Sequence, residues 1–169
     1  EAIWSKTVPS FRGMNIFTPV VSGDNIFAST YQNKSWLYSV KKGDNGFSVN
    51  DVWENKLQGY MSTPVIINGF AYMHLQNQRF SCIDLSSGET KWTSSKSFGK
   101  YWSLVAHKNR ILALDQKGIL YLIEADPKEL KILDSREIAE SESWAHLAIS
   151  GDQIFIRDLK NLSVFQFQN

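Results

Sequence analysis

The chain has 169 residues, of which 43% are hydrophobic and 13% are aromatic, including six tryptophans. This composition is sufficient for a buried core and excludes an intrinsically disordered protein. The 18 lysines and arginines almost balance the 17 aspartates and glutamates, for a formal net charge of +1, and no basic stripe stands out. The electrostatic footprint of a nucleic-acid-binding protein is therefore absent. No apolar run approaches the roughly 18 residues that span a membrane.

Four units repeat along the chain at a nearly constant spacing. Each opens with a short apolar run that starts at Thr18, Thr63, Ser103 or His146. A second apolar run follows at the same offsets, at residues 26–28, 71–73, 111–113 and 154–156. A third is centred on Trp36, Phe80, Leu120 and Leu162. A fourth ends at Trp53 and Trp92, and we expect the segment at Trp4 to be a strand of this fourth type.

Four short strands in every 40–45 residues, separated by Gly, Asn, Asp and Ser, are typical of a β-propeller blade. The sequence therefore predicts an all-β protein of about four blades, in units 1–53, 54–92, 93–138 and 139–169. A sandwich, the alternative all-β architecture, would show irregular strand spacing instead. The one helix-like stretch, residues 126–130, is short and is predicted to be a turn between the third and fourth strands of its unit.

The second unit ends in Ile-Asp-Leu-Ser-Ser-Gly-Glu-Thr-Lys-Trp at residues 83–92. This segment resembles the pyrroloquinoline-quinone (PQQ) type of propeller repeat, in which an Asp, a Gly turn and a Trp close each blade. The resemblance implies that Asp84 and Gly88 shape the turn. It also implies that Trp4, Trp53 and Trp92 dock neighbouring blades. The third unit departs from the pattern, with Ile132 or Leu133 near the tryptophan position.

The closing segment, residues 144–167, resembles the last blade of bacterial PQQ-like proteins that carry no quinone, similar to the outer-membrane assembly propeller lipoprotein. This resemblance implies a periplasmic or extracytoplasmic location and a larger ring, usually eight-bladed. We expect either a longer native chain with blades upstream or a homodimer in which Trp4 of one copy completes the last blade of the other. The start at Glu1 leaves room for a removed signal peptide or lipid anchor.

No residue set in the sequence demands catalysis. Cys82 is the single cysteine, sits in an apolar run and is predicted to be a buried small hydrophobe. His74, His107 and His146 lie in different units without zinc-site spacing. We therefore expect no catalytic, metal or cofactor-binding residues. Two alternatives stay open: a fragment of a PQQ-dependent dehydrogenase, and a carbohydrate-active propeller with a deep pocket and two carboxylates about 5–10 Å apart.

Aromatic residues concentrate in the loops that lead into the first strand of each unit: Phe11, Tyr60, Tyr101, Trp102 and Trp144. Such loops open on one face of a propeller, and Arg12 and Lys100 lie beside them. Exposed aromatics with nearby cations suit a protein- or peptide-binding surface, although the same residues could pack between blades. The functional hypothesis is a non-catalytic binding scaffold of the bacterial envelope.

Overall fold

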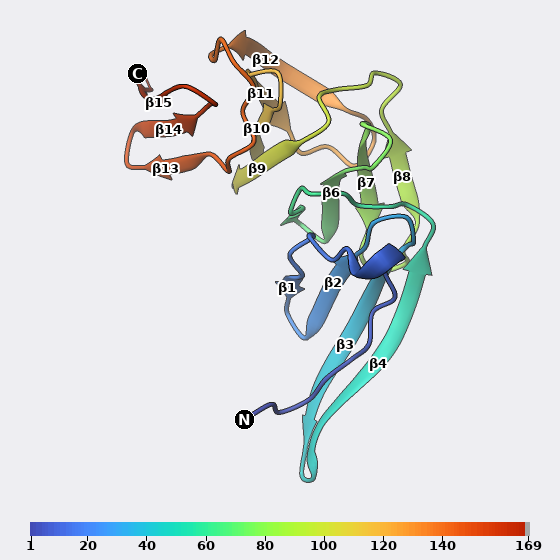
Figure 1. Ribbon diagram of the computed structural model, residues 1–169. Coiled ribbons are helices and arrows are strands. Elements are labelled where there is room, and N and C mark those ends of the chain that lie inside the picture. Colours follow the sequence, from blue (N-terminus) through green and yellow to red (C-terminus); the bar gives the residue numbers. More distant parts are fainter. Residues whose placement is uncertain (168–169) are drawn as a thin grey trace.

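The computed structural model describes residues 1–167, and these form fifteen strands arranged as four antiparallel sheets (Figure 1). The first sheet contains β1 (Val20–Ser22), β2 (Asn25–Ser29), β3 (Ser35–Gly43) and β4 (Gly46–Asn55). The second contains β5 (Val65–Ile67), β6 (Phe70–His74), β7 (Phe80–Asp84) and β8 (Thr90–Thr93). The third contains β9 (Trp102–His107), β10 (Arg110–Asp115), β11 (Ile119–Glu124) and β12 (Lys131–Glu137). The fourth contains β13 (Ala148–Ser150), β14 (Gln153–Arg157) and β15 (Leu162–Gln166).

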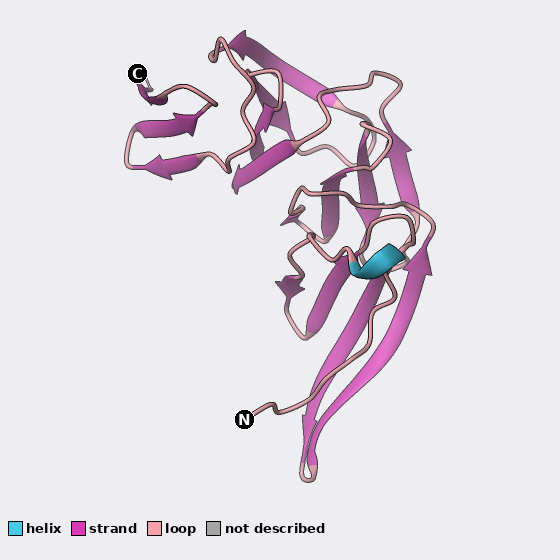
Figure 2. Cartoon of the chain, viewed as in Figure 1, coloured by secondary structure: helices cyan, strands magenta, loops and turns pink. Residues whose placement is uncertain are grey.

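Each sheet is a meander of consecutive hairpins, and the four sheets follow one another along an arc that keeps the two termini far apart (Figure 1). The prediction of an all-β chain of four propeller blades is confirmed, including the three strands of the last blade. Strands and loops make up nearly all of the described chain, and the helical exception is the single 3-10 turn η1, Phe11–Gly13 (Figure 2). Among residues 1–167, no helix is long and apolar enough to cross a membrane.

Because the strands alternate in direction, the connections divide between two faces of the arc. One face, called the row face below, carries the segments that enter each first strand and the turns that join each second strand to the third. These are residues 11–19, 30–34, 56–64, 75–79, 94–101, 116–118, 138–147 and 158–161. The opposite face carries the remaining turns, at residues 23–24, 44–45, 68–69, 85–89, 108–109, 125–130 and 151–152.

The core consists of apolar layers between neighbouring sheets. Between the first two sheets, Phe27 and Leu37 pack against Met73 and Ile83. A larger layer between the second and third sheets is centred on Phe80 and includes eleven buried residues. Since burying one such side chain stabilises the fold by about 1.5–3 kcal/mol, these layers hold the blades together.

Each of the three four-stranded sheets has an irregularity in register at the same place, between its third and fourth strands. In the first two sheets it sets Trp53 opposite Leu37 and Trp92 opposite Cys82. In the third sheet the corresponding residue opposite Leu122 is Asp134, which is exposed. The tryptophan position of the third sheet is therefore held by Asp134, next to Leu133, near which the sequence placed it. The hairpin between the third and fourth strands is longer in the third sheet than in the second, which shifts the residue at this position.

The expected strand at Trp4 is not formed, because residues 1–10 pair with no sheet. The open edge of β15, which such a strand would complete, lies at the other end of the arc (Figure 1). It runs along the first sheet instead, where Lys6 pairs with Asp51 at 2.9 Å and Val8 packs on the cluster of Ala28, Trp36 and Tyr38.

Candidate functional site

Five aromatic side chains form a continuous row across the row face. The chain of ring contacts runs from Phe11 to Tyr31, Tyr60, Tyr101 and Trp144, with centroid separations of 6.3, 5.2, 5.7 and 5.4 Å. Tyr60 and Tyr101 are nearly parallel, whereas both ends of the row meet edge to face. Offset-stacked and edge-to-face pairs at these distances are mutually stabilising, so the row is a defined structure and not a chance exposure of side chains.

Hydrogen bonds between the loops hold this aromatic row in place. The backbone N–H of Phe11 donates to the carbonyl of Tyr31 at 3.4 Å, and that of Gln116 donates to Tyr101 at 2.8 Å. The Leu159 N–H donates to the carbonyl of Glu142, two residues before Trp144. The Gln76 N–H donates to the carbonyl of Gln58, in the loop of Tyr60, at 2.9 Å. Each ring is therefore carried by a loop that is hydrogen-bonded to another loop.

The row is most exposed at its two ends and partly buried in the middle. The exposed fraction is 40% for Phe11 and 61% for Trp144, whereas Tyr31, Tyr60 and Tyr101 are intermediate. Large aromatic residues left open to solvent in this way are uncommon without a partner, because they forgo the free energy of burial.

Cations sit over two of the rings. The Arg12 guanidinium lies 5.0 Å from the centroid of Phe11, and the Lys100 ammonium lies 5.4 Å from that of Tyr101. Burial raises the pKa of the Tyr60 phenol, and the adjacent Tyr101 adds to this effect. Interaction with Tyr101 raises the pKa of Lys100 in turn, so this lysine is fully charged at neutral pH. The row therefore presents neutral phenols flanked by fixed positive charge.

Trp144 is also held through its indole N–H, which donates to Oε2 of Glu142 at 3.0 Å. The other carboxylate oxygen, Oε1, accepts from the Gln116 side chain at 2.8 Å. The Trp144 ring is thus anchored on its polar edge while most of its surface remains open, an arrangement typical of aromatic side chains at protein interfaces.

The structure brings together four of the five aromatics that the sequence suggested for a binding face. Trp102 is the exception, since it is 3% exposed and packs between Phe98, Tyr121 and His74. It is the first residue of β9, where the side chain turns into the layer between blades. Sequence reasoning missed Tyr31, because it considered only the loops that enter first strands. The turns after second strands reach the same face, so the order of the strands could have indicated that Tyr31 lies there.

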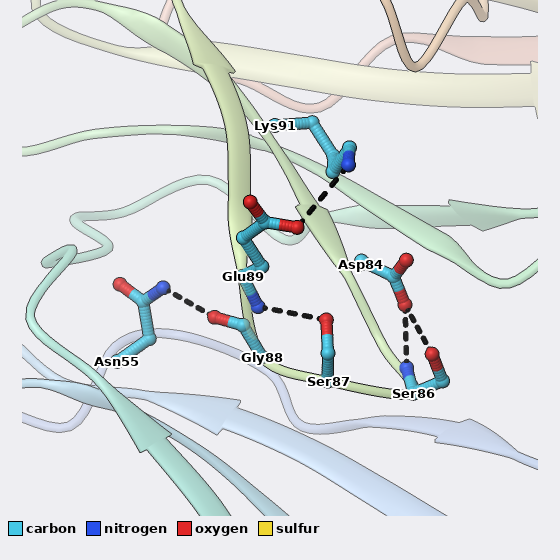
Figure 3. Close-up of polar contacts among 7 residues, drawn as sticks. All are labelled: Asn55, Asp84, Ser86, Ser87, Gly88, Glu89 and Lys91. Atoms are coloured by element: carbon cyan, nitrogen blue, oxygen red, sulfur yellow. Dashed lines mark hydrogen bonds and ion pairs between the residues drawn. The ribbon is translucent and has the colours of Figure 1, made fainter.

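A second set of contacts joins neighbouring blades on the opposite face. Trp53 of the first sheet donates its indole N–H to the carbonyl of Leu85 at 2.8 Å. Its ring fills the space beside Gly88, where a Cβ would lie 2.6 Å from the Trp53 ring. Asn55 reaches the same turn, donating from Nδ2 to the Gly88 carbonyl at 2.7 Å (Figure 3). The same Nδ2 donates to Thr90 Oγ1 at 3.0 Å.

Asp84 organises the turn that receives Trp53. Its Oδ1 accepts from the backbone N–H of Ser86 at 2.8 Å and from the Ser86 hydroxyl at 2.6 Å (Figure 3). These hydrogen bonds lower the pKa of the Asp84 carboxyl. Gly88 has φ = +74°, a conformation that favours glycine. We propose that Asp84 and Gly88 form the socket into which Trp53 docks.

Trp92 makes the corresponding contact one blade later, donating from its indole N–H to the carbonyl of Asp126 at 2.9 Å. Its ring packs against Tyr72 and Phe80. We propose the same docking role for it. Trp4, the third tryptophan of the expected set, is 38% exposed and lies in the strandless N-terminal segment.

The remaining titratable residues do not converge on a reactive centre. Cys82 is buried, as predicted, and burial raises the pKa of its thiol to about 12. His74 is fully buried against Trp102, while His107 and His146 are exposed. Within residues 1–167, no group of three or more His, Cys, Asp or Glu side chains is placed to hold a metal ion.

A shallow hollow of about 370 Å³ lies between the N-terminal segment and β3–β4 and includes the carboxylates of Asp51 and Glu54. Both carboxylates are paired with lysines, Asp51 with Lys6 and Glu54 with Lys34. Both carboxylates are also solvent-exposed, which is unlike the apolar pocket that surrounds the general acid of a glycosidase.

Comparison with solved structures places the fold among β-propellers. BamB from Moraxella catarrhalis superimposes with a TM-score of 0.69 at 13% identity, over 89% of this chain and 42% of that one. The β-propeller domain of Cps50 (Swd1) from Myceliophteria thermophila gives a TM-score of 0.63 at 13% identity, over 86% of this chain and 53% of that one. The computationally designed Ika4 protein gives 0.63 at 8% identity, over 92% of this chain and 99% of that one.

Sequence comparison is more specific. The chain is 24% identical over 170 residues to the outer membrane protein assembly factor BamB of Moranella endobia, covering 93% of this chain. It spans 40% of the length of that curated relative. A PQQ-type family described as outer membrane protein assembly factor BamB matches residues 1–94, more than half of the chain. On this match and the repeated four-stranded sheets, the chain belongs to the PQQ-type family of outer membrane protein assembly factor BamB.

Proposed function

We propose that this chain is a non-catalytic, protein-binding scaffold of the bacterial cell envelope, and that it binds a polypeptide partner on the aromatic row. The observation that supports this proposal is the aromatic row, in which five contiguous rings lie on one face and the most exposed rings are at its ends. Aromatic side chains surrounded by a polar rim are the residues that contribute most to protein–protein binding energy.

The arrangement of the rings favours a polypeptide over a sugar. Tyr60 and Tyr101 stack on each other, and Trp144 meets Tyr101 edge to face, so the middle rings share their faces among themselves. Their edges remain for a partner, together with the polar side chains of the surrounding loops. Such a surface can accept apolar side chains and backbone hydrogen-bonding groups, whereas sugar binding uses free aromatic faces.

The placement in the envelope rests on the relatives. The sequence relative is named as an outer membrane protein assembly factor, BamB, and one structural neighbour is also a BamB. Assembly at the outer membrane occurs outside the cytoplasm, which supports a periplasmic or extracytoplasmic location for this chain. Ring closure by two copies is not part of the proposal, because Trp4 lies in a segment held against the chain's own first sheet by Lys6 and Val8.

Site-specific photocrosslinking in the envelope of an expressing bacterium tests the proposal. A benzophenone amino acid would replace Tyr101 or Trp144 on the row face, and Glu129 on the opposite face as the matched control. We expect discrete protein adducts from the first two positions and none from Glu129. Those adducts should disappear when Tyr60→Ala is added. Equal labelling from all three positions, or adducts indifferent to Tyr60→Ala, would contradict a partner site on the row.

A further inference from the structure

The connections on the two faces of the arc carry opposite net charge, although the whole chain is almost neutral. The connections on the row face hold eight lysines and arginines but three acidic residues, Glu140, Glu142 and Asp158. The connections on the opposite face hold two basic residues, Lys108 and Lys128, against six aspartates and glutamates.

Two of the three acidic residues on the row face are already engaged in hydrogen bonds. Asp158 is 9% exposed, and its Oδ1 accepts the backbone N–H groups of Lys160 and Asn161 at 2.7 and 2.6 Å. The Glu142 carboxylate accepts from Trp144 and Gln116. With all three carboxylates counted, the connections of the row face keep an excess of five positive charges, and such a local excess selects and orients charged partners.

The ring spacing of the row is slightly shorter than the same-side repeat of an extended polypeptide. Its neighbouring rings are 5.2–6.3 Å apart. In an extended chain, side chains two residues apart on the same side are separated by about 6.5–7 Å. The four steps of the row cover about 23 Å, roughly the length of seven extended residues. Four alternate side chains of such a segment could contact rings of the row, and the three intervening side chains would reach the cations at the rim.

From the charge division and this spacing we propose that the row face binds an extended segment in which acidic side chains alternate with apolar ones. The proposal rests on the proposed function and specifies the partner's chemistry. Arg12 and Lys100 lie directly over rings of the row, so the partner's carboxylates would meet them beside its apolar contacts. The acidic opposite face would repel the same segment, which orients binding.

Fluorescence anisotropy with labelled synthetic peptides of about nine residues tests this chemistry. Three probes of equal length alternate leucine with aspartate, asparagine or lysine. We expect the aspartate probe to bind the complete chain at least about tenfold more tightly than the lysine probe at low salt. The difference should narrow toward 0.5 M salt, where the Debye length is only about 4 Å.

Charge reversals on the protein provide the matched comparison. The double variant Arg12→Glu, Lys100→Glu should weaken the aspartate probe about three- to tenfold at low salt, the range expected for a few exposed charge pairs. Lys128→Glu makes the same kind of change on the opposite face and should alter binding less than about twofold. A double variant that binds the probe like the unaltered chain would overturn the proposal.

The other outcomes distinguish a failure of this inference from a failure of the proposed function. If the asparagine probe binds as tightly as the aspartate probe, and Tyr101→Ala weakens both, the acidic specificity is refuted while a peptide site on the row survives. If Tyr101→Ala affects neither probe, the proposed function fails as well. If phosphatidylglycerol vesicles bind the chain through Arg12 and Lys100, and the aspartate probe does not compete, the face is a lipid-binding surface and the peptide proposal is overturned.

Discussion

The contact between Trp53 and Gly88 allows a direct test of how the blades dock. In Gly88→Ala, the new methyl group would lie 2.6–3.0 Å from three atoms of the Trp53 ring, on a residue with φ = +74°. Two penalties therefore combine: about 1–2 kcal/mol for alanine in the left-handed conformation and about 1–3 kcal/mol for overpacking against a ring that is itself held by Leu85. We expect a total loss of about 2–5 kcal/mol in the free energy of unfolding.

Gly69→Ala provides the matched control in the same blade. Gly69 has φ = +81°, but no atom lies within 4 Å of the position of its Cβ. It therefore carries the conformational penalty alone. Urea denaturation followed by circular dichroism would give both free energies, and the difference between them isolates the steric contact with Trp53.

Adding Trp53→Ala tests the same contact from the other side. The double variant with Gly88→Ala should lose less than the sum of the single losses, because removing the ring removes the clash. Losses for Gly88→Ala and Gly69→Ala that agree within about 0.5 kcal/mol would refute the docking argument, since they would show that the contact stores no energy.

Three further predictions concern other buried or exposed groups. Trp92→Ala should cost several kcal/mol in the same denaturation assay, because it removes a packed ring and leaves the Asp126 carbonyl without its donor; a loss below about 1 kcal/mol would rule out docking by Trp92. Burial lowers the pKa of His74 to about 4, whereas its pKa in the unfolded chain is about 6.5. The stability that the neutral His74 side chain contributes is therefore fully present above about pH 6.5. It should fall by up to about 3 kcal/mol as the pH drops from 6.5 to 4, and His74→Leu should flatten this slope in pH-dependent unfolding. Leucine is the natural choice because Leu114 occupies the same position of the next blade, opposite the start of the third strand. Trp144→Phe should remove most of the tryptophan fluorescence that iodide quenches, since its side chain is 61% exposed, and unchanged quenching would mean that the row is covered in solution.

The fold could be predicted from the sequence because the four units repeat. Apolar runs that return at constant offsets identify strands even where each run is too short to be diagnostic, and this applies equally to weak units such as the third. The repeat pattern did not predict whether a segment finds a strand to pair with, or the exact register of a pair. Trp4 has the residue type of a fourth strand, but residues 1–10 pair with no strand and follow the first sheet. Asp134 takes the register position of Trp92 because the hairpin between the third and fourth strands is longer in the third sheet than in the second.

The candidate site was predictable in part, for a related reason. Exposure of an aromatic residue depends on which way its loop turns, and neighbours in sequence can point to opposite environments. Tyr101 joins the row and Trp102, one residue later, is buried, because strand β9 begins between them and directs alternate side chains to opposite sides. Tyr31 could be found only by knowing that turns after second strands share a face with the loops that enter first strands.

The charge division between the faces follows from the same topology. In a meander, every other connection reaches the same face, so a basic and an acidic loop that are close in sequence end on opposite sides of the molecule. Lys100 and Lys108 illustrate this: they flank one short strand, yet the first lies beside the aromatic row and the second among acidic turns. A net charge of +1 conceals this arrangement, because the two faces cancel in the sum. Since attraction to a partner depends on the local potential and not on the total charge, an almost neutral propeller can still discriminate strongly between acidic and basic segments.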